Sequence, residues 1–158
     1  MRSEWNHEYD PTIEDLYSVS RLIDGVQYQL NLTDTAGQEE YRGLWAASNL
    51  KSDAFLLVYD ITNAESLPQL QSFIEMIQIE AEGRMERGEL PPVTIIAGNK
   101  CDLATRRQVR SIEGLEWARE RGCMFMETSA REKVNIEESF ACTSSFVEHT
   151  DKQCWYAK

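Results

Sequence analysis

The fold is decided by residues 26–41, which read VQYQLNLTDTAGQEEY. In the first half of this stretch every second residue is apolar, and these residues are Val26, Tyr28, Leu30 and Leu32. A period of two predicts a strand with one buried face. The predicted strand runs into Asp34 and then into a turn that contains Gly37. Polar chemistry is therefore expected at the point where this strand ends.

Three residues after the strand offer chemistry suited to a phosphorylated ligand. The Asp34 carboxylate can hold Mg²⁺ directly or through water. The Gly37 amide can approach a terminal phosphate because no Cβ obstructs it. The Gln38 side chain can orient an attacking water. An Asp before a small turn is by itself usually only a turn, so the rest of the chain has to decide.

Residues 34–41, DTAGQEEY, resemble the switch II segment of Ras-family small GTPases. An eight-residue match of this kind is hard to obtain by chance. The resemblance implies that Asp34 binds the metal and nucleotide, that Gly37 contacts the nucleotide, and that Gln38 is the catalytic residue.

A second motif, residues 8–15, reads EYDPTIED. Pro11 excludes a helical conformation for the residue before it, so this segment is expected to be extended or a loop. It is similar to the effector loop (switch I) of the Ras subfamily, which implies that Thr12 binds both Mg²⁺ and the γ-phosphate. The same resemblance implies effector-binding roles for Tyr9, Asp10, Pro11, Ile13, Glu14 and Asp15. Acidic residues there would meet a basic patch on a partner.

The remaining strands follow from short apolar runs. Residues 17–22 and 26–33 flank Asp24-Gly25, which predicts a hairpin. Residues 54–59 (AFLLVY) and 93–97 (VTIIA) are continuous apolar runs, typical of parallel strands buried on both faces. Residues 124–127 are expected to form a last short strand.

Helices are predicted between these strands. One is expected between Ser66, as its cap, and Gly83, with Leu70, Phe73, Ile74 and Ile77 on its inner face. Another is bracketed by Ser111 and Gly122, with Ile112, Leu115 and Ala118 inward. A third opens at Asn135, where Glu138 would complete a capping box, with Ile136, Phe140 and Val147 inward. Strands alternating with helices predict an α/β domain with a mainly parallel sheet.

Two motifs follow the last two strands, where open α/β sheets bind ligands. They are Asn99-Lys100-Cys101-Asp102 and Glu127-Thr128-Ser129-Ala130. A carboxylate at Asp102 offers two acceptors to the N1–H and N2–H₂ groups of guanine, and backbone N–H groups of the second motif, residues 127–130, can donate to O6. The pair resembles the guanine-specificity motifs of the GTPase family. It implies nucleotide-binding roles for Asn99, Lys100, Asp102, Ser129 and Ala130, with the Lys100 stem covering the purine.

The resemblance covers residues 8–147 and implies the P-loop NTPase (small GTPase) fold. No G-x-x-x-x-G-K-S/T motif occurs in the 158 residues. We therefore expect one incomplete small GTPase domain over residues 1–158, with residues 149–158 as a non-homologous tail. The first strand, the P-loop and the first helix of the family would be lacking. Unpaired edges are then expected between the strand that ends at Thr33 and the one that begins at Ala54.

Three hypotheses follow for the function. The first is a Ras-like switch in signal transduction that binds GTP or GDP with Mg²⁺ and hydrolyses GTP. Its partners would be effectors, an exchange factor and a GTPase-activating protein. The second is a nucleotide-free interaction module that presents the effector loop. The third is an incomplete chain from a longer GTPase, which reconciles intact motifs with the missing P-loop.

Composition limits the partners and the compartment. A formal net charge of −11 argues against nucleic acid as a partner. The four cysteines lack metal-ligand spacing. No signal peptide or apolar span of membrane length is evident, so a cytoplasmic location and free thiols are expected. Family relatives end in a prenylated C-a-a-X signal, which would place them at the cytosolic face of the plasma membrane. The end QCWYAK does not match that signal, so no lipid anchor is evident.

Overall fold

The structure is a computed structural model that describes residues 14–23, 26–35 and 50–148. It divides into two compact units, residues 1–51 and 52–158, and each unit is considered by itself. The organisation of residues 1–158 as a single domain with a tail at 149–158 stays a prediction.

The described part of the first unit is an antiparallel hairpin of β1 (Glu14–Ile23) and β2 (Val26–Thr35). Ile23 pairs with Val26, so a two-residue connection joins the strands. The hairpin predicted around Asp24-Gly25 is therefore confirmed. Both strands extend further than predicted, and the ladder reaches the pair of Glu14 with Thr35 because the pairing continues beyond the apolar residues.

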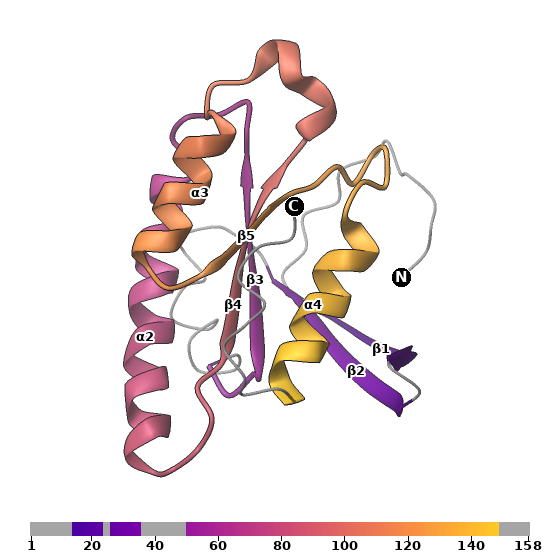
Figure 1. Cartoon of the computed structure of the whole chain (residues 1–158), viewed down its shortest axis with the longest axis vertical. Helices are drawn as coiled ribbons and strands as arrows, with labels where there is room; N and C mark the ends of the chain where they lie inside the picture. The colour runs from indigo at the N-terminus through magenta and orange to yellow at the C-terminus, as the bar shows by residue number, and fades with distance from the viewer. Residues whose placement is uncertain (1–13, 24–25, 36–49, 149–158) are drawn as a thin grey trace. The chain divides into compact units, whose positions relative to one another are not determined.

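The second unit is built on three parallel strands in the order β3-β4-β5. In chain order its elements are β3 (Ala54–Asp60), η2 (Pro68–Leu70), α2 (Gln71–Glu86), β4 (Val93–Asn99), η3 (Cys101–Arg106), α3 (Ser111–Glu120), β5 (Met124–Glu127) and α4 (Ile136–Glu148). Figure 1 shows α2 and α3 on one face of this sheet and α4 on the other. The predicted α/β class with a parallel sheet flanked by helices is confirmed.

The strands of the described residues form two sheets, one for the hairpin and one for the parallel strands. The strands that end at Thr35 and begin at Ala54 belong to different units, so the gap predicted between them stays a prediction. None of the described helices is long and apolar enough to cross a membrane.

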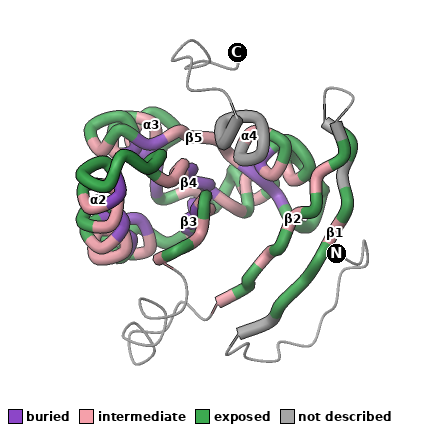
Figure 2. Tube along the Cα trace, turned by 90° about the horizontal axis from the view of Figure 1, so that it is seen from below, coloured by how far each residue is buried: buried purple, intermediate pink, exposed green. Residues whose placement is uncertain are grey.

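The core of the second unit lies around β4, as the buried colour in Figure 2 shows. Ile95, Ile96 and Ala97 are almost completely buried, because helices cover both faces of this central strand. The prediction that residues 54–59 are buried on both faces is wrong. In β3 buried and more exposed residues alternate, and Val58 is 51% exposed. Among the described strands β3 is hydrogen-bonded only to β4.

Two helix boundaries differ from the sequence-based expectation. Gly83 does not end α2, which continues to Glu86. The helix is closed by Gly88 at φ 74°, where Gly88 N donates to Met85 O and Glu89 N donates to Arg84 O. This is a Schellman motif, and it needs a left-handed residue just after the helix, which Gly88 supplies. Gly122, at φ 68°, closes α3 in the predicted place.

The helix starts also differ. Ser66 does not cap α2, because its hydroxyl bonds to the backbone of Asp60. The α3 cap is Arg110, whose backbone N–H donates to the Glu113 side chain. Ile112 is 48% exposed, so its predicted inward position is wrong. The inner face of α3 is formed by smaller residues, Gly114 and Ala118, because the sheet approaches closely there.

Tyr59 explains that close approach. Its side chain is 2% exposed, and its hydroxyl lies between Gly98 of β4 and Gly114 of α3. A Cβ at Gly98 would lie 2.7 Å from the Tyr59 hydroxyl, and one at Gly114 would overlap it. The hydroxyl has no hydrogen-bond partner among the described residues, and burial raises the pKa of Tyr59 to about 12. Two glycines are therefore required to pack this tyrosine beside the strand ends.

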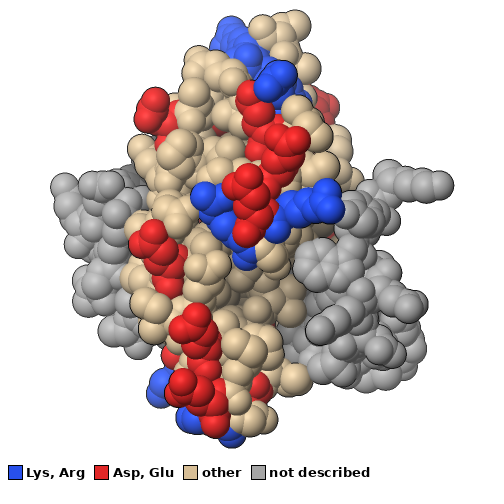
Figure 3. All heavy atoms as spheres, turned by 60° about the vertical axis from the view of Figure 1, so that its left-hand side comes forward, with Lys and Arg blue, Asp and Glu red and all other residues tan. Residues whose placement is uncertain are grey.

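Acidic and basic side chains share the surface of this unit. Figure 3 shows Asp and Glu spread over the face that carries α2 and α3, with Lys and Arg between them. Helix α2 contributes Glu75, Glu80, Glu82 and Glu86. The number of acidic side chains on this face is in keeping with the excess of Asp and Glu over Lys and Arg in the sequence.

We predict that Gly114→Ala lowers the free energy of unfolding by about 1–3 kcal/mol, because the added methyl overlaps Tyr59 and Phe125. Gly83→Ala is the matched control. There the nearest atom is the end of the Arg87 side chain at 3.3 Å, and the helix should gain roughly 0.5–1 kcal/mol. Urea unfolding monitored by circular dichroism measures both. Equal stabilities of the two variants would contradict this packing.

Candidate functional site

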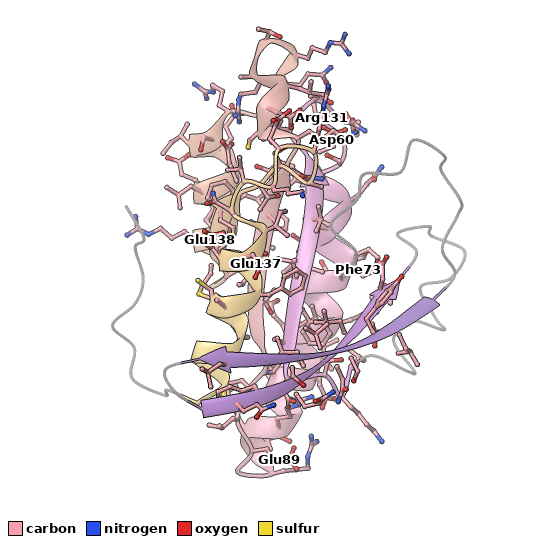
Figure 4. All side chains as sticks on the ribbon, turned by 90° about the vertical axis from the view of Figure 1, so that its right-hand side faces the viewer. Asp60, Phe73, Glu89, Arg131, Glu137 and Glu138 are labelled. Carbon is pink, nitrogen blue, oxygen red and sulfur yellow. The ribbon has the colours of Figure 1, made fainter. Side chains whose placement is uncertain are left out.

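The three parallel strands end at one edge of the sheet, as Figures 1 and 4 show. Their last residues are Asp60, Asn99 and Glu127. Asp60 pairs with Asn99, and Gly98 pairs with Glu127. Parallel pairing in this register brings the segments after β4 and β5 together, as the sequence predicted for the carboxyl edge.

Asn99 joins these two segments through its side chain. Its Oδ1 accepts hydrogen bonds from the Ala130 amide at 3.2 Å and the Thr128 hydroxyl at 3.3 Å. The Cys101 amide donates to Thr128 O at 3.0 Å, which ties the same segments through the backbone. The loops that follow β4 and β5 are thus held together by three hydrogen bonds.

Asp102 is anchored to the other segment by Ser129. The Ser129 hydroxyl donates to Asp102 Oδ1 at 2.6 Å and accepts from the Glu132 amide at 3.0 Å. Ser129 is completely buried, whereas Asp102 is exposed. A buried hydroxyl therefore orients an exposed carboxylate, and within the described ranges no hydrogen bond to the second carboxylate oxygen is seen.

Lys100 has an unusual backbone conformation, with φ 66° and ψ 33°. This left-handed conformation is uncommon for residues other than Gly. The turn carries the side chain toward β3, where Lys100 Nζ lies 2.6 Å from Asp60 Oδ2. The Asp60 Oδ1 atom accepts from the Thr62 amide and hydroxyl at 2.8 and 2.7 Å. Partial burial raises the pKa of the Asp60 carboxyl, but hydrogen bonds from Lys100 and Thr62 outweigh burial and hold the pKa below its usual value.

Glu127 is the corresponding anchor at the end of β5. Its carboxylate accepts two hydrogen bonds from the Arg107 guanidinium, at 2.5 and 3.0 Å. These bonds raise the pKa of Arg107. Asn135, at φ 55°, donates from its side-chain amide to Glu127 O at 2.7 Å. This contact fixes the start of the 128–130 segment, and the capping box predicted for Asn135 and Glu138 stays a prediction.

The backbone donors predicted to bind guanine O6 already have partners within the chain. Thr128 N donates to Gly98 O, Ser129 N to Val134 O, and Ala130 N to the Asn99 side chain. The Ala130 N–H bonds a side chain rather than the backbone, so it is the donor that a ligand can share or take over most easily.

Comparisons with known proteins identify the family. The Ras family model matches residues 1–148. A "Ras-like protein" of Laccaria bicolor is 39% identical over 140 residues, which are 89% of this chain and 64% of that relative. The chain belongs to the Ras family. It spans less than two thirds of the length of the relative it matches.

Ras family membership agrees with the α/β fold and confirms the resemblance drawn from the motifs. Family members generally bind guanine nucleotides with Mg²⁺ and interact with regulators and effectors. Of the residues expected to bind nucleotide, the structure brings together Asn99, Lys100, Asp102, Ser129 and Ala130 at one edge of the second unit. Their roles toward a ligand stay predictions.

The switch residues expected in a Ras family protein belong to the first unit. Asp34 lies near the end of β2, opposite Asp15 in the hairpin register. Glu14 and Asp15 are in β1, and their side chains are not described. The other predicted residues lie outside the described part of the chain, and these are Tyr9, Asp10, Pro11, Thr12, Ile13, Gly37 and Gln38.

Asp102 presents an exposed carboxylate that Ser129 orients, and Ala130, the next residue after Ser129, donates its amide to Asn99. A carboxylate and an amide N–H are the kinds of group that can pair with the edge of a guanine base. No group of three His, Cys, Asp or Glu residues that could hold a metal occurs in the described ranges. Of the two predicted Mg²⁺ ligands, Asp34 is described and Thr12 is not. A magnesium site therefore stays a prediction.

Sequence reasoning missed three features at this edge. They are the roles of Asp60 and Arg107, and the hydrogen bond from the Asn135 side chain to Glu127 O at the end of β5. Asp60 had a usable signal, since it directly follows an apolar run that was predicted to be parallel to the next strand. Arg107 had none, because its pairing with Glu127 spans 20 residues. The thiols of Cys101, Cys123 and Cys142 are free, as predicted, and burial raises the pKa of Cys101.

We predict that Ser129→Ala lowers the free energy of unfolding by about 1–3 kcal/mol, because it removes a buried hydroxyl that bonds Asp102 and the Glu132 amide. Hydrogen exchange at the Glu132 amide should accelerate in the same variant. Ser111→Ala changes an exposed serine and should alter stability by less than about 0.5 kcal/mol. Unchanged exchange at Glu132 would contradict the assigned contact.

Proposed function

We propose that this chain provides the guanine-recognising part of a GTP-binding molecular switch. The observation that carries the proposal is the joining of residues 99–102 to residues 128–130 by Asn99 and Asp102. Asp102 would accept from guanine N1–H and N2–H₂. Ala130 would donate to O6, shared with or released from Asn99. Adenine presents the opposite pattern of donors and acceptors, so this arrangement favours guanine.

The catalytic part of the proposal rests on residues of the first unit. Thr12 and Asp34 would hold Mg²⁺, which neutralises charge on the phosphate oxygens. Gly37 would contact the γ-phosphate, and Gln38 would orient the attacking water. Loss of the γ-phosphate on hydrolysis would release Thr12 and Gly37, and the effector segment at residues 9–15 would report that change to partner proteins.

A second candidate function is a nucleotide-free interaction module that presents the effector segment. One observation favours it. The backbone amides of Thr128, Ser129 and Ala130 are all paired within the chain, so the base-binding edge is satisfied without a ligand. Under this function guanosine and adenosine would perturb residues 99–102 equally little.

Titration of guanosine into the isotope-labelled chain, followed by amide chemical shifts in NMR spectra, separates these functions. We expect shifts at residues 99–102 and 128–130 with guanosine and not with adenosine. We predict that Asp102→Asn weakens guanosine binding about 10- to 100-fold and makes xanthosine the better ligand, because it replaces an acceptor by a donor. Asp53→Asn, an exposed change of the same charge at the other end of β3, should leave binding unchanged. Retained guanosine preference in Asp102→Asn would contradict the assignment.

A further prediction concerns the phosphates. The 158 residues contain no G-x-x-x-x-G-K-S/T cradle, which would supply a lysine and several backbone donors to the phosphates. Each charge-assisted bond from such a cradle to a phosphate would add about 1.5–3 kcal/mol to the binding free energy. Because this chain lacks those bonds, we expect its affinity for Mg²⁺-GTP to lie within about tenfold of its affinity for guanosine. Turnover should be negligible. Titrating a fluorescent GTP analogue with Mg²⁺, and again with EDTA, measures this. A submicromolar, Mg²⁺-dependent affinity would reveal a phosphate site in these residues.

A further inference from the structure

Asp60 occupies a position at the candidate site that the sequence motifs do not include. It ends β3 and pairs in register with Asn99, the residue before Lys100. Figure 4 labels it at the edge where the strands end. Its side chain is 24% exposed, whereas that of Lys100 is 50% exposed, and the two are joined by the 2.6 Å ion pair.

The Asp60 carboxylate is held in place independently of Lys100. Its Oδ1 atom accepts both hydrogen bonds from Thr62, and its backbone N–H donates to the Ser66 hydroxyl at 3.0 Å. The next amide, of Ile61, donates to Asn99 O at 3.1 Å. The second carboxylate oxygen, Oδ2, is the one that accepts from Lys100. The Asp60 carboxylate is therefore a fixed acceptor for the ammonium group of Lys100.

This arrangement matters because lysine has many rotamers, and a half-exposed lysine keeps most of them. Fixing the ammonium at the end of β3 restricts the conformations open to the four-carbon stem between Asp60 and the Lys100 backbone. A stem that is ordered before a ligand arrives reduces the entropy lost on binding. The left-handed backbone of Lys100 directs the side chain toward Asp60, so backbone and ion pair favour the same placement.

We propose that Asp60 is a positioning residue of the guanine site, acting through Lys100. This role depends on the proposed guanine-binding function. It adds to that function a residue that lies outside both guanine motifs. Asp60 does not contact the base. It holds Lys100 so that the apolar stem forms one wall of the base site while Asp102 and Ala130 bind the base edge.

Two variants test the role of the ion pair. Asp60→Asn keeps an oxygen for the Thr62 bonds and removes the charge that pairs with Lys100. Lys100→Met keeps a long apolar stem and removes the ammonium. We expect each to weaken guanosine binding about three- to tenfold. The double variant should be no weaker than either single variant, because both changes break one interaction. Asp53→Asn is again the charge-matched control.

A second readout separates positioning from a general effect on the fold. In the ligand-free chain, NMR relaxation of the Lys100 side-chain methylene groups should show greater mobility in Asp60→Asn than in the unsubstituted chain. The Asp53→Asn control should show no increase in the mobility of the Lys100 methylene groups. Amide shifts of Thr62 and Ser66 should change little, since their bonds to Asp60 are retained.

The outcomes distinguish failure of this role from failure of the proposed function. If guanosine causes no specific shifts in the unsubstituted chain, the guanine site itself is wrong, and the role of Asp60 falls with it. If Asp102→Asn abolishes binding while Asp60→Asn retains full affinity, only the positioning role is overturned. Additive losses in the double variant, or unchanged Lys100 mobility in Asp60→Asn, would overturn it as well.

Discussion

The parallel pairing of β4 with β5 is the constraint on which the candidate site depends. It sets Gly98 beside Glu127, so the residues that follow each strand emerge side by side. In this register the Asn99 side chain accepts from the Ala130 amide, and the Cys101 amide donates to Thr128 O. A shift of one residue would turn the side chains that follow β5 to the opposite face of the sheet. The chemistry of the edge is thus a consequence of backbone pairing.

Charged hydrogen bonds then hold the strand ends in place. Each outer strand of the parallel sheet ends in a carboxylate that a cation approaches: Asp60 with Lys100, and Glu127 with Arg107. Both carboxylates are mostly shielded from solvent, where charge-assisted bonds are stronger than on an open surface. Asp102 differs, since it is exposed and anchored by a neutral serine. The carboxylate left available to a ligand is therefore Asp102.

The residues proposed to recognise the base and those proposed to act on phosphate belong to different units. Asn99, Asp102 and Ala130 are in residues 52–158, where the β3-β4-β5 sheet orders them without any ligand. Asp34 belongs to residues 1–51, on a two-stranded hairpin. Base recognition is therefore the part of the proposed function that the second unit can support by itself.

The sequence alone determined the α/β class, the family and the guanine motifs. Short apolar runs predicted strands β3, β4 and β5 nearly to the residue, because the apolar residues of a strand are adjacent in the sequence. It could not determine the roles of Asp60 and Arg107, or the exposure of Ile112. Those depend on which residues the register brings opposite one another and on how closely Tyr59 lets α3 approach. Local periodicity is encoded within a few residues, whereas ion pairs across 20 and 40 residues form only when the chain is folded.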